Sequence, residues 1–491
     1  MDRRIKLSLG ILMLASHVLG CVSLPPAEQP VVMRAPELVE VARSTTAGRG
    51  QWPASHWWEK FGDNQLNDFV KQALSANPSL DIARARLRGT LQTARLAGAR
   101  LGPELSGYAS IDYERFSGTG LFPPPIGGTT ATEGELGLDL SYAFDFWGKN
   151  RALQNSALDR AKVAEAENAA AELFIAAAVT QTYYRYQTEL KRLGLARRIA
   201  ALRAQLVSLN RSRVDQGLVP VTVLRLNQRD LAGQRQSVTA IETSLAIRKE
   251  QLRALLGAGP ADLGAIKDGP LPDPESGLPE RLGLDLLARR PDVAASRWQV
   301  EAAVQDMRSA ETQFYPDVNL RALAGFSTIT LRHLLDFDSR SWDAGIAIHL
   351  PIFDAGRLRA NLGVSRADLD QAVAQYNLAL LEAVREVAQH DASLQGLKRQ
   401  RLSLAESREA DKKIATAVGS RARQGLASAI ESLEAELPLL TAEDTDLQLQ
   451  GLELAAKVDL IKSLGGGYLA DAFPSLSPGE TGTTRAQKAE K

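Results

Sequence analysis

Two kinds of hydrophobic pattern follow one another along the chain. In four short stretches apolar and polar residues alternate with the period of a β-strand. These stretches are residues 104–116, 135–146, 317–327 and 342–353. The longest unbroken alternation places six apolar side chains on one face, namely Leu136, Leu138, Leu140, Tyr142, Phe144 and Phe146. After each pair of such stretches comes an Ala-rich stretch, which predicts a helix far longer than the usual ~10–14 residues.

The first long helical stretch starts at Gly148 and contains no proline before Gly217. The two glycines lie 69 positions apart (217 − 148), and a straight helix of that length spans about 100 Å. Gly217 and Pro220 then reverse the chain, which returns as a second helix to Leu256. Residues 149–256 are therefore predicted to form one helical hairpin.

The second half of the chain repeats this plan. Gly356 and Gly425 are again 69 positions apart (425 − 356), and the tripeptide Gln-Gly-Leu stands at both reversals. The second hairpin is predicted over residues 356–464. A shift of 208 positions (425 − 217) superimposes the two reversals, so the chain is a tandem duplication.

Shorter elements open each repeat. Asp63 is expected to cap a helix over residues 64–76. A second helix is predicted over residues 81–101, with Ile82, Leu87, Leu91 and Leu96 as candidate inward-facing residues. The whole chain divides into a signal peptide (1–20), an extended arm (21–55), a first repeat (56–257), a linker (258–278), a second repeat (279–467) and a polar tail predicted to be disordered (468–491).

The N-terminus has the features of a bacterial targeting segment. Arg3, Arg4 and Lys6 precede an apolar stretch too short to span a bilayer permanently. The sequence Val-Leu-Gly-Cys ending at Cys21 resembles a lipobox, which implies cleavage before Cys21 and N-acyl and S-diacylglycerol attachment to that residue. The alternative is an ordinary signal peptide with a chance cysteine, although Cys21 is the only cysteine in the chain. The lack of an Asp after Cys21 favours the outer membrane.

The four alternating stretches have the length of transmembrane β-strands. The alternative is a soluble sheet with one buried face. Charged residues on the polar face of each stretch favour a water-filled lumen instead. Four strands cannot close a barrel, an open edge in lipid is very costly, and the smallest single-chain barrels use about eight strands. The chain is therefore predicted to assemble; three copies would supply twelve strands and six hairpins, but the strand count alone does not fix that number.

The net charge and the lack of catalytic motifs reduce the number of functions that the chain could have. The chain has 58 basic and 58 acidic residues, so its net charge gives no argument for a nucleic-acid partner. It contains no HExxH sequence, phosphate-binding loop or nucleophile elbow. We therefore expect no enzyme, no metal and no other cofactor besides the lipid. The five histidines are scattered, at His17, His56, His333, His349 and His390.

These features together resemble the outer membrane factor family of TolC-like proteins, in its NodT-like lipoprotein branch serving efflux pumps of the resistance–nodulation–division (RND) type. The matching residues are Cys21, Asp145–Lys149, Phe353–Arg357, the two Gln-Gly-Leu reversals and Leu464–Tyr468. The resemblance implies a mixed α/β membrane protein. In it, long helical hairpins form a periplasmic α-barrel, and four strands per chain contribute to a β-barrel shared by a homotrimer.

The resemblance also implies the function and the partners. The trimer is expected to be the exit duct of a tripartite efflux system, lipid-anchored in the outer membrane and passing small molecules such as drugs. A periplasmic adaptor and an inner-membrane RND-type transporter are the implied partners, with adaptor contacts at the hairpin tips Gly217, Leu218, Gly425 and Leu426. The alternatives are a type I secretion conduit for proteins and, with less support, a periplasmic adaptor lipoprotein. An adaptor normally has one hairpin, whereas this chain has two of equal length.

The family closes the inner end of its channel with acidic rings after the second reversal. The matching positions, six and nine residues beyond Gly425, are Glu431 and Glu434. They are three residues apart and share a helix face, so three chains would place six carboxylates around one axis. The equally simple alternative is a solvated helix face.

The family also uses an arginine-centred network at this tip. Arg421 and Arg423 lie before Gly425, but Leu426 and Ala427 occupy the positions after it. The sequence therefore departs from the family pattern beside the predicted gate.

Overall fold

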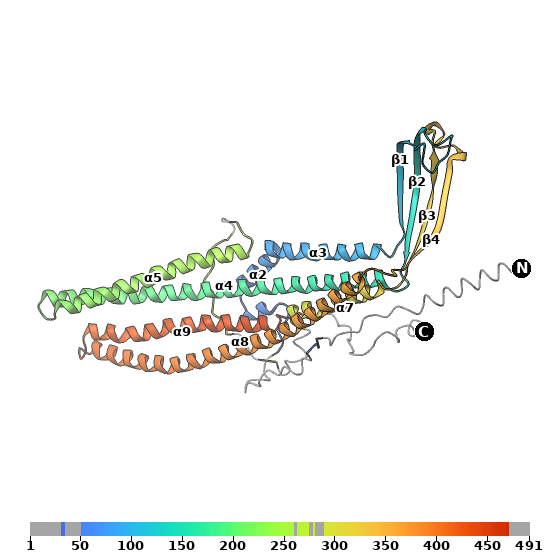
Figure 1. Cartoon of the computed structure of the whole chain (residues 1–491). Helices are drawn as coiled ribbons and strands as arrows, with labels where there is room; N and C mark the ends of the chain where they lie inside the picture. The colour runs from blue at the N-terminus through green and yellow to red at the C-terminus, as the bar shows by residue number, and fades with distance from the viewer. Residues whose placement is uncertain (1–30, 35–50, 260–262, 274–277, 280–288, 471–491) are drawn as a thin grey trace. The chain divides into compact units, whose positions relative to one another are not determined.

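The computed structural model describes residues 31–34, 51–259, 263–273, 278–279 and 289–470. The described chain forms two compact units (Figure 1). Among the described residues, the strand unit comprises 31–34, Arg84–Glu165 and Ala295–Leu378, and the helix unit comprises those within 51–83, 166–294 and 379–470. The predicted signal peptide lies outside the described residues, as do most of the arm and most of the tail.

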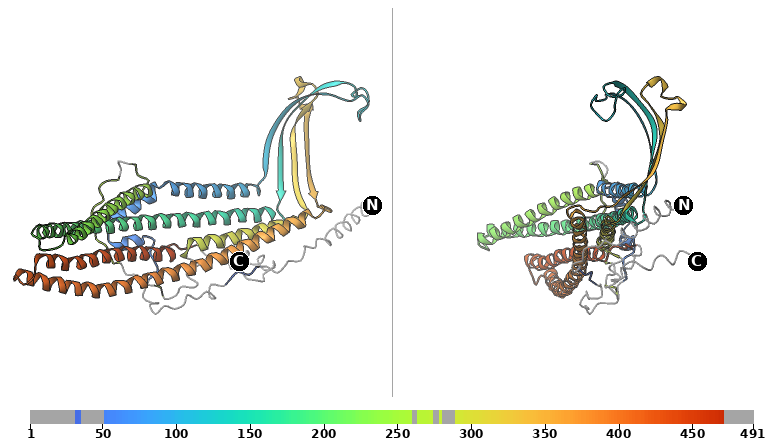
Figure 2. Two further views of the ribbon diagram at one scale, coloured as in Figure 1. Left: turned by 60° about the vertical axis from the view of Figure 1, so that its left-hand side comes forward. Right: turned by 45° about the vertical axis from the view of Figure 1, so that its right-hand side comes forward.

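The strand unit contains one curved antiparallel sheet in the order β1-β2-β3-β4 (Figure 2). The strands are β1 (Glu104–Arg115), β2 (Thr130–Phe144), β3 (Asp317–Thr328) and β4 (Arg340–His349). β2 starts at Thr130, before the predicted residue 135, and β4 ends at His349 rather than at 353. Pro351 explains the early end of β4, because proline has no N–H for the ladder. The short helices η3 (Leu331–His333) and η4 (Phe337–Ser339) join β3 to β4.

The strand register places the alternating apolar residues on one shared face. Leu140 pairs with Leu105 on one side and with Ala322 on the other, and Ala322 pairs in turn with Ala344. Because side chains alternate across a strand, this single row fixes the face of every other residue. The predicted two-sided sheet is confirmed.

The two repeats build hairpins of identical length. Both outgoing helices, α4 (Lys149–Asp215) and α8 (Arg357–Arg423), have 67 residues, and both returning helices, α5 (Val221–Leu255) and α9 (Ala429–Ser463), have 35 residues. α9 continues through Pro438. In Figures 1 and 2, α5 runs beside α4 and α9 runs beside α8. None of the described helices carries a stretch apolar enough to cross a membrane.

Each outgoing helix starts just after an aspartate: Asp145 lies three residues before Gly148, and Asp354 lies two residues before Gly356. The Asp145 carboxylate accepts hydrogen bonds from the backbone N–H groups of Asn150 and Arg151, at 2.9 and 3.0 Å. Asp354 caps α8 in the same way, accepting from Leu358 N at 2.9 Å. Each carboxylate satisfies amide groups that have no partner within the helix and sits at the positive end of the helix dipole.

The repeats also agree where each returning helix meets the start of its own repeat. The Asn77 side chain donates to the carbonyl of Leu255 at 2.7 Å, and the Arg290 guanidinium donates to the equivalent carbonyl of Ser463 at 3.0 Å. Asn77 and Arg290 each precede the proline that starts the next helix, α3 (Pro78–Ala99) or α7 (Pro291–Thr312). The duplication therefore extends from the helix lengths to single contacts.

One face of α3 differs from the prediction. The helix starts at Pro78 and ends at Ala99, slightly earlier than residues 81–101. Ile82, Leu91 and Leu96, expected to face inward, are exposed, and Leu87 is half-buried. Ile82 and Leu96 lie close to one face of the helix, whereas Leu91, nine positions after Ile82, lies on the opposite face. No described part of this chain covers these side chains.

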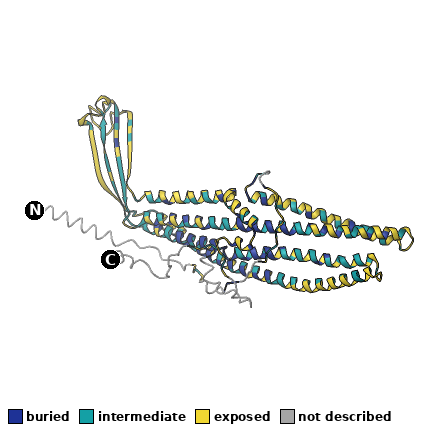
Figure 3. Cartoon of the chain, turned by 180° about the vertical axis from the view of Figure 1, so that it is seen from behind, coloured by how far each residue is buried: buried dark blue, intermediate teal, exposed yellow. Residues whose placement is uncertain are grey.

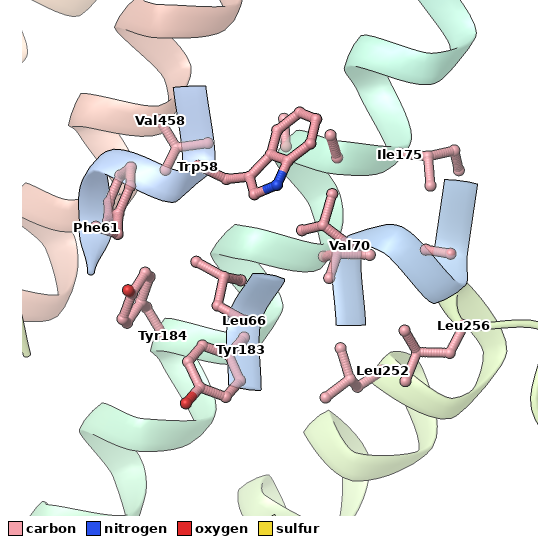
Figure 4. Close-up of a cluster of buried hydrophobic side chains, with 14 of the residues drawn as sticks. Trp58, Phe61, Leu66, Val70, Ile175, Tyr183, Tyr184, Leu252, Leu256 and Val458 are labelled. Carbon is pink, nitrogen blue, oxygen red and sulfur yellow. The ribbon is translucent and has the colours of Figure 1, made fainter. Parts of the chain in front are cut away.

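The largest hydrophobic cluster lies in the helix unit, where η2 (Trp57–Phe61), α2 (Asn64–Ala76), the start of α3, α4, α5 and α9 meet (Figure 4). η2 and α2 pack against α4, α5 and α9. Asp63 caps α2 as predicted, and its second oxygen accepts a 2.6 Å hydrogen bond from the buried Tyr183 hydroxyl. Burial, together with Asp63, raises the pKa of Tyr183. The labelled side chains include Trp58, Phe61, Leu66, Val70, Ile175, Tyr184, Leu252, Leu256 and Val458.

A cluster of carboxylates lies between α4 and α7 in the strand unit. Burial, helped by the negative charges of Glu301 and Asp306, raises the pKa of Asp159 to about 6. Its neighbours are paired: Arg297 contacts Glu301 at 2.7 Å, and Arg160 contacts Asp306 at 2.5 Å. Burial also raises the pKa of Glu301, although Arg297 opposes that shift, and Asp159 is the member of the cluster with the largest rise.

Replacing Asp159 with asparagine is expected to stabilise the chain at pH 7 by about 1–2 kcal/mol, because a raised carboxyl pKa disfavours the folded state once the group is charged. The stability that Asp159 contributes is present below its ordinary pKa of 3.8 and is lost as the pH rises through about 6. Thermal unfolding of the purified protein from pH 4 to pH 8 measures this effect. The gap between the variant and the native protein should widen as the pH rises to about 7; a gap that does not change with pH contradicts the assignment.

Candidate functional site: the exposed sheet and the hairpin tips

Many side chains on the apolar face of the sheet are exposed in the single chain, and Figure 3 colours the exposed residues of the strands yellow. Trp342 is 81% exposed and Ile348 is 69% exposed, although both belong to the apolar face. Soluble monomers rarely expose continuous apolar patches of this kind. The face is therefore suited to contact lipid. Its other exposed residues include Leu105, Ile111, Tyr113, Leu136, Leu138 and Ile346.

The opposite face is polar, as the alternation predicts. Asp139 of β2 and Asp343 of β4 both pair with Leu323 of β3, so the two carboxylates lie in the same row across the sheet. Arg321 pairs with Ser141 in the next row of this face. One face carries charged groups along the strands, whereas the charges of the apolar face, Arg115 and Arg340, stand only at strand ends. This distribution matches a sheet with water on one side and lipid on the other.

The sheet has two open edges in the described chain. β1 pairs only with β2, and β4 pairs only with β3, so the outer backbone groups of both strands have no partner there. Unpaired N–H and C=O groups in lipid cost several kcal/mol each. A sheet with a lipid-facing side and two open edges requires strands from elsewhere.

Both hairpin tips use the same glycine turn. Gly217 and Gly425 have positive φ angles of 69° and 72°. In each tip the next residue donates back over the turn: Leu218 N to Arg213 O at 2.8 Å, and Leu426 N to the equivalent Arg421 O at 2.9 Å. This is the Schellman arrangement, which ends a helix at a left-handed glycine. Leu218 and Leu426 are thereby presented at the tips, 64% and 65% exposed.

The predicted gate carboxylates lie just beyond the second tip. Glu431 and Glu434 are both exposed in the first turns of α9. The Ser428 hydroxyl accepts a hydrogen bond from Glu431 N at 3.1 Å and caps the helix. Ser428 and Glu431 have the Ser-x-x-Glu spacing typical of a helix N-terminus, a signal that the sequence analysis missed.

The two arginines before the tip hold the turn and do not contact the carboxylates. Arg421 donates to the carbonyl of Leu426 at 3.3 Å, and Arg423 donates to the hydroxyl of Ser420 at 3.1 Å. The ion pairs of the described chain do not include either arginine with Glu431 or Glu434. The structure therefore brings these four residues to one tip without joining them.

Ion pairs that the sequence analysis missed join the two hairpins above the tips. Arg198 of α4 contacts Glu436 of α9 at 2.5 Å, and Arg192 contacts Asp444 at 2.9 Å. Two such pairs at matching positions link the first repeat to the second along antiparallel helices. The sequence alone does not show which opposite charges pair, because it does not show that α4 and α9 are neighbours.

A groove of about 590 Å³ lies beside the second tip. It is bounded by the end of α4, the end of α8 and the start of α9. Small and apolar side chains form most of its wall, with Arg423 at its margin. The lining residues include Leu209, Gly419, Ala422, Ala429 and Leu433.

The remaining predicted site lies elsewhere. Cys21 is outside the described residues, so its lipidation stays a prediction. In the part of the chain that the structure describes, no group of three or more His, Cys, Asp or Glu side chains is placed to hold a metal ion.

Comparison with known proteins gives consistent matches to both repeats. A protein-family model described as outer membrane efflux protein matches residues 69–258 and 282–466. The multidrug resistance outer membrane protein MdtP of Escherichia coli strain K12 is 31% identical over 459 residues, which is 92% of this chain and 94% of that protein. MdtQ of Escherichia coli O6:H1, also a multidrug resistance outer membrane protein, is 30% identical over 466 residues, covering 93% of this chain and 96% of the relative.

Solved structures give the same picture. The crystal structure of the outer membrane protein VceC from Vibrio cholerae superimposes with a TM-score of 0.76 at 32% identity. The superposition covers 85% of this chain and all of that one. The exposed sheet and the paired hairpins therefore occur together in a known outer membrane fold.

Proposed function

The chain belongs to the outer membrane efflux protein family, and we propose that three copies of it join their strands and hairpins into one exit duct. It is an outer membrane channel of an efflux system, with the TolC-like fold of that family. The observation that carries the trimer is the four-stranded sheet, which has an exposed apolar face and two open edges.

Three copies resolve both features of the sheet. β4 of one copy would pair with β1 of the next, and the ring would close with twelve strands and no edge in lipid. Channels of this family are generally trimeric. The exposed Ile82 and Leu96 on one face of α3 fit the same assembly, because a neighbouring copy would supply the partner that they lack in one chain.

Cross-linking between strand edges tests this arrangement. Cysteine pairs, one in β1 (Glu104–Arg115) and one in β4 (Arg340–His349), would be scanned along both edges in the membrane-embedded protein. Correctly aligned pairs should give covalent dimers and trimers and no larger species. Pairs between β1 and the interior strand β3 are the matched control and should stay monomeric. A ladder that continues past three copies, or no cross-link at any register, contradicts the closed trimer.

We also propose that Cys21 carries the lipid and anchors each chain in the outer membrane. The support is the lipobox-like sequence around the chain's only cysteine. The acyl chains contribute about 0.8 kcal/mol per buried methylene group, and more than one chain gives stable anchoring. We assign the chain no enzymatic reaction, no metal and no nucleic-acid partner.

The hairpin tips are proposed to dock a periplasmic adaptor that leads to an inner-membrane RND-type transporter. Gly217 and Gly425 present equivalent exposed leucines, Leu218 and Leu426, so each trimer would offer six similar apolar tips. The groove beside Arg423 offers a further surface for an adaptor helix. The relatives named for multidrug resistance favour small molecules as cargo over the proteins of a type I secretion system.

Glu431 and Glu434 are proposed to form the acidic constriction at the inner end of the duct. Their exposure and the absence of an ion pair to Arg421 or Arg423 in the described chain leave both carboxylates open to cations. Replacing both glutamates with glutamine is expected to weaken block by divalent cations at least tenfold in planar-bilayer recordings of the purified channel, because the charge that holds the cation is lost. Glu409→Gln, an exposed carboxylate far along α8, is the control. Unchanged block in the double variant removes both residues from the constriction.

A further inference from the structure

A short part of the N-terminal arm is held against the strand unit by side chains of α8. Asp370 Oδ1 accepts a hydrogen bond from Val31 N at 3.0 Å. Asn377 makes two bonds: its Oδ1 accepts from Arg34 N at 2.8 Å, and its Nδ2 donates to Val32 O at 3.0 Å. All three bonds go to the backbone of the arm, so these contacts do not depend on which side chains the arm carries.

The spacing of the two α8 residues matches the spacing of the arm. Asp370 and Asn377 are seven positions apart, so they lie on one face of α8 about 10.5 Å apart along the axis. Val31 and Arg34 are three positions apart, which corresponds to about 10 Å of extended chain. The side chain of Met33 contacts the neighbouring helix α7, where its sulfur lies 3.9 Å from the Arg297 guanidinium. The helix and the arm therefore run in register.

The same pairing fixes the direction of the arm. Val31 pairs with Asp370 and Arg34 pairs with the later residue Asn377, so the arm runs parallel to α8. The start of α8 is the end joined to β4, so the N-terminal end of the clamped segment, Val31, lies on that side.

We propose that Asp370 and Asn377 form a backbone clamp that points the arm, and with it Cys21, at the membrane spanned by the strands of the same chain. This inference rests on the proposed function, since it assumes that the strands cross the outer membrane and that Cys21 carries lipid. Arg357, the first residue of α8, lies about 20 Å before Asp370 along the helix. Cys21 precedes Val31 by ten residues, which reach at most about 35 Å. The ten-residue span from Cys21 to Val31 can therefore reach past the start of α8, but it cannot reach a membrane more than about 35 Å from Val31.

Hydrogen exchange on the intact lipoprotein tests the clamp itself. In Asp370→Ala with Asn377→Ala, the peptide that contains residues 31–34 should exchange about tenfold faster or more, because the acceptors of Val31 N and Arg34 N are gone. Asn361→Ala removes another exposed α8 amide, which contacts Gln313 at 3.3 Å, and should leave that peptide unchanged. Unchanged exchange in the double variant overturns the clamp.

Cysteine pairs test the direction. The matched pairs Val31→Cys with Asp370→Cys and Arg34→Cys with Asn377→Cys should cross-link. The crossed pairs, Val31→Cys with Asn377→Cys and Arg34→Cys with Asp370→Cys, should not, because about 10 Å of helix separates Asp370 from Asn377, more than the ~7 Å between Cα atoms that a disulfide spans. Single-cysteine variants control for reaction with Cys21. Crossed pairs that react as well as matched ones overturn the parallel arrangement.

The intact mass of the same samples shows whether Cys21 is acylated, and so tests the lipid anchor separately from the clamp. Matched cross-links in a chain without acyl groups would keep the clamp, refute the lipid anchor of the proposed function and remove the proposed role of the clamp in aiming the lipid. Acyl groups together with failed matched cross-links would keep the anchor and remove the clamp.

Discussion

Gly465→Ala is expected to destabilise the folded chain by about 3–5 kcal/mol, because the substitution combines backbone strain with a collision. Gly465 ends α9 with a φ of 87°, a conformation that L residues adopt reluctantly. A Cβ atom there would overlap the carbonyl oxygen of Arg289, which is backbone and cannot rotate away. The junction between the returning helix and the start of the second repeat would have to separate.

Two other glycines provide matched controls for this prediction. Gly257 is the equivalent residue of the first repeat; its φ is 61° and an added Cβ would meet the carbonyl oxygen of Ala76, so Gly257→Ala should behave like Gly465→Ala. Gly425 has a φ of 72° but nothing within 4 Å of an added Cβ, so Gly425→Ala should cost only about 1–2 kcal/mol. The melting temperatures of the three purified variants give the order of their stability losses. Equal losses at Gly425 and Gly465 contradict the collision.

Arg290→Ala is the second large effect, with an expected loss of about 2–4 kcal/mol. The Arg290 side chain is buried and contacts Asp292 at 2.6 Å, Glu386 at 2.9 Å and the carbonyl of Ser463 at 3.0 Å. Its removal leaves two carboxylates without their cation and one buried carbonyl without a donor. Because both carboxylates are partly exposed, water can compensate some of this loss, which places the estimate below the largest values for buried pairs.

Asn77→Ala is the control, since Asn77 makes the equivalent contact in the first repeat without an ion pair. Its side chain donates to Leu255 O and accepts from Ser79 N at the start of α3, and the loss of these two neutral hydrogen bonds should cost about 1–2 kcal/mol. The melting temperatures of the two variants at low and high salt give the comparison. If the Arg290→Ala variant melts no lower than the Asn77→Ala variant, the ion pairs of Arg290 contribute nothing to the stability of the folded chain.

Repetition and alternation explain why the fold is readable from the sequence. The two Gln-Gly-Leu reversals mark positions where the helix must end in a left-handed residue, and only glycine adopts that conformation freely. The strict alternation of β2 gives both faces of the sheet because side-chain direction has a period of two. Both signals are local, so they need no knowledge of what lies beside them.

The errors fall where an element depends on a partner from outside the local sequence. The apolar residues of α3 predict burial, yet Ile82 and Leu96 are exposed because a helical stripe does not reveal which molecule covers it. The pair of Arg198 and Glu436 was invisible for the same reason, since 238 positions separate the two residues. The cap formed by Ser428 was readable from its Ser-x-x-Glu spacing and was overlooked beside the stronger hypothesis for Glu431.

The mass of the intact complex tests the central claim most directly. Protein extracted from membranes in mild detergent would be examined by native mass spectrometry, without cross-linker. Three copies of the chain, each cleaved before Cys21 and acylated there, are the predicted result, since only further copies can pair the open edges of β1 and β4. A monomer, or a species released from membranes by salt alone, would contradict the shared channel.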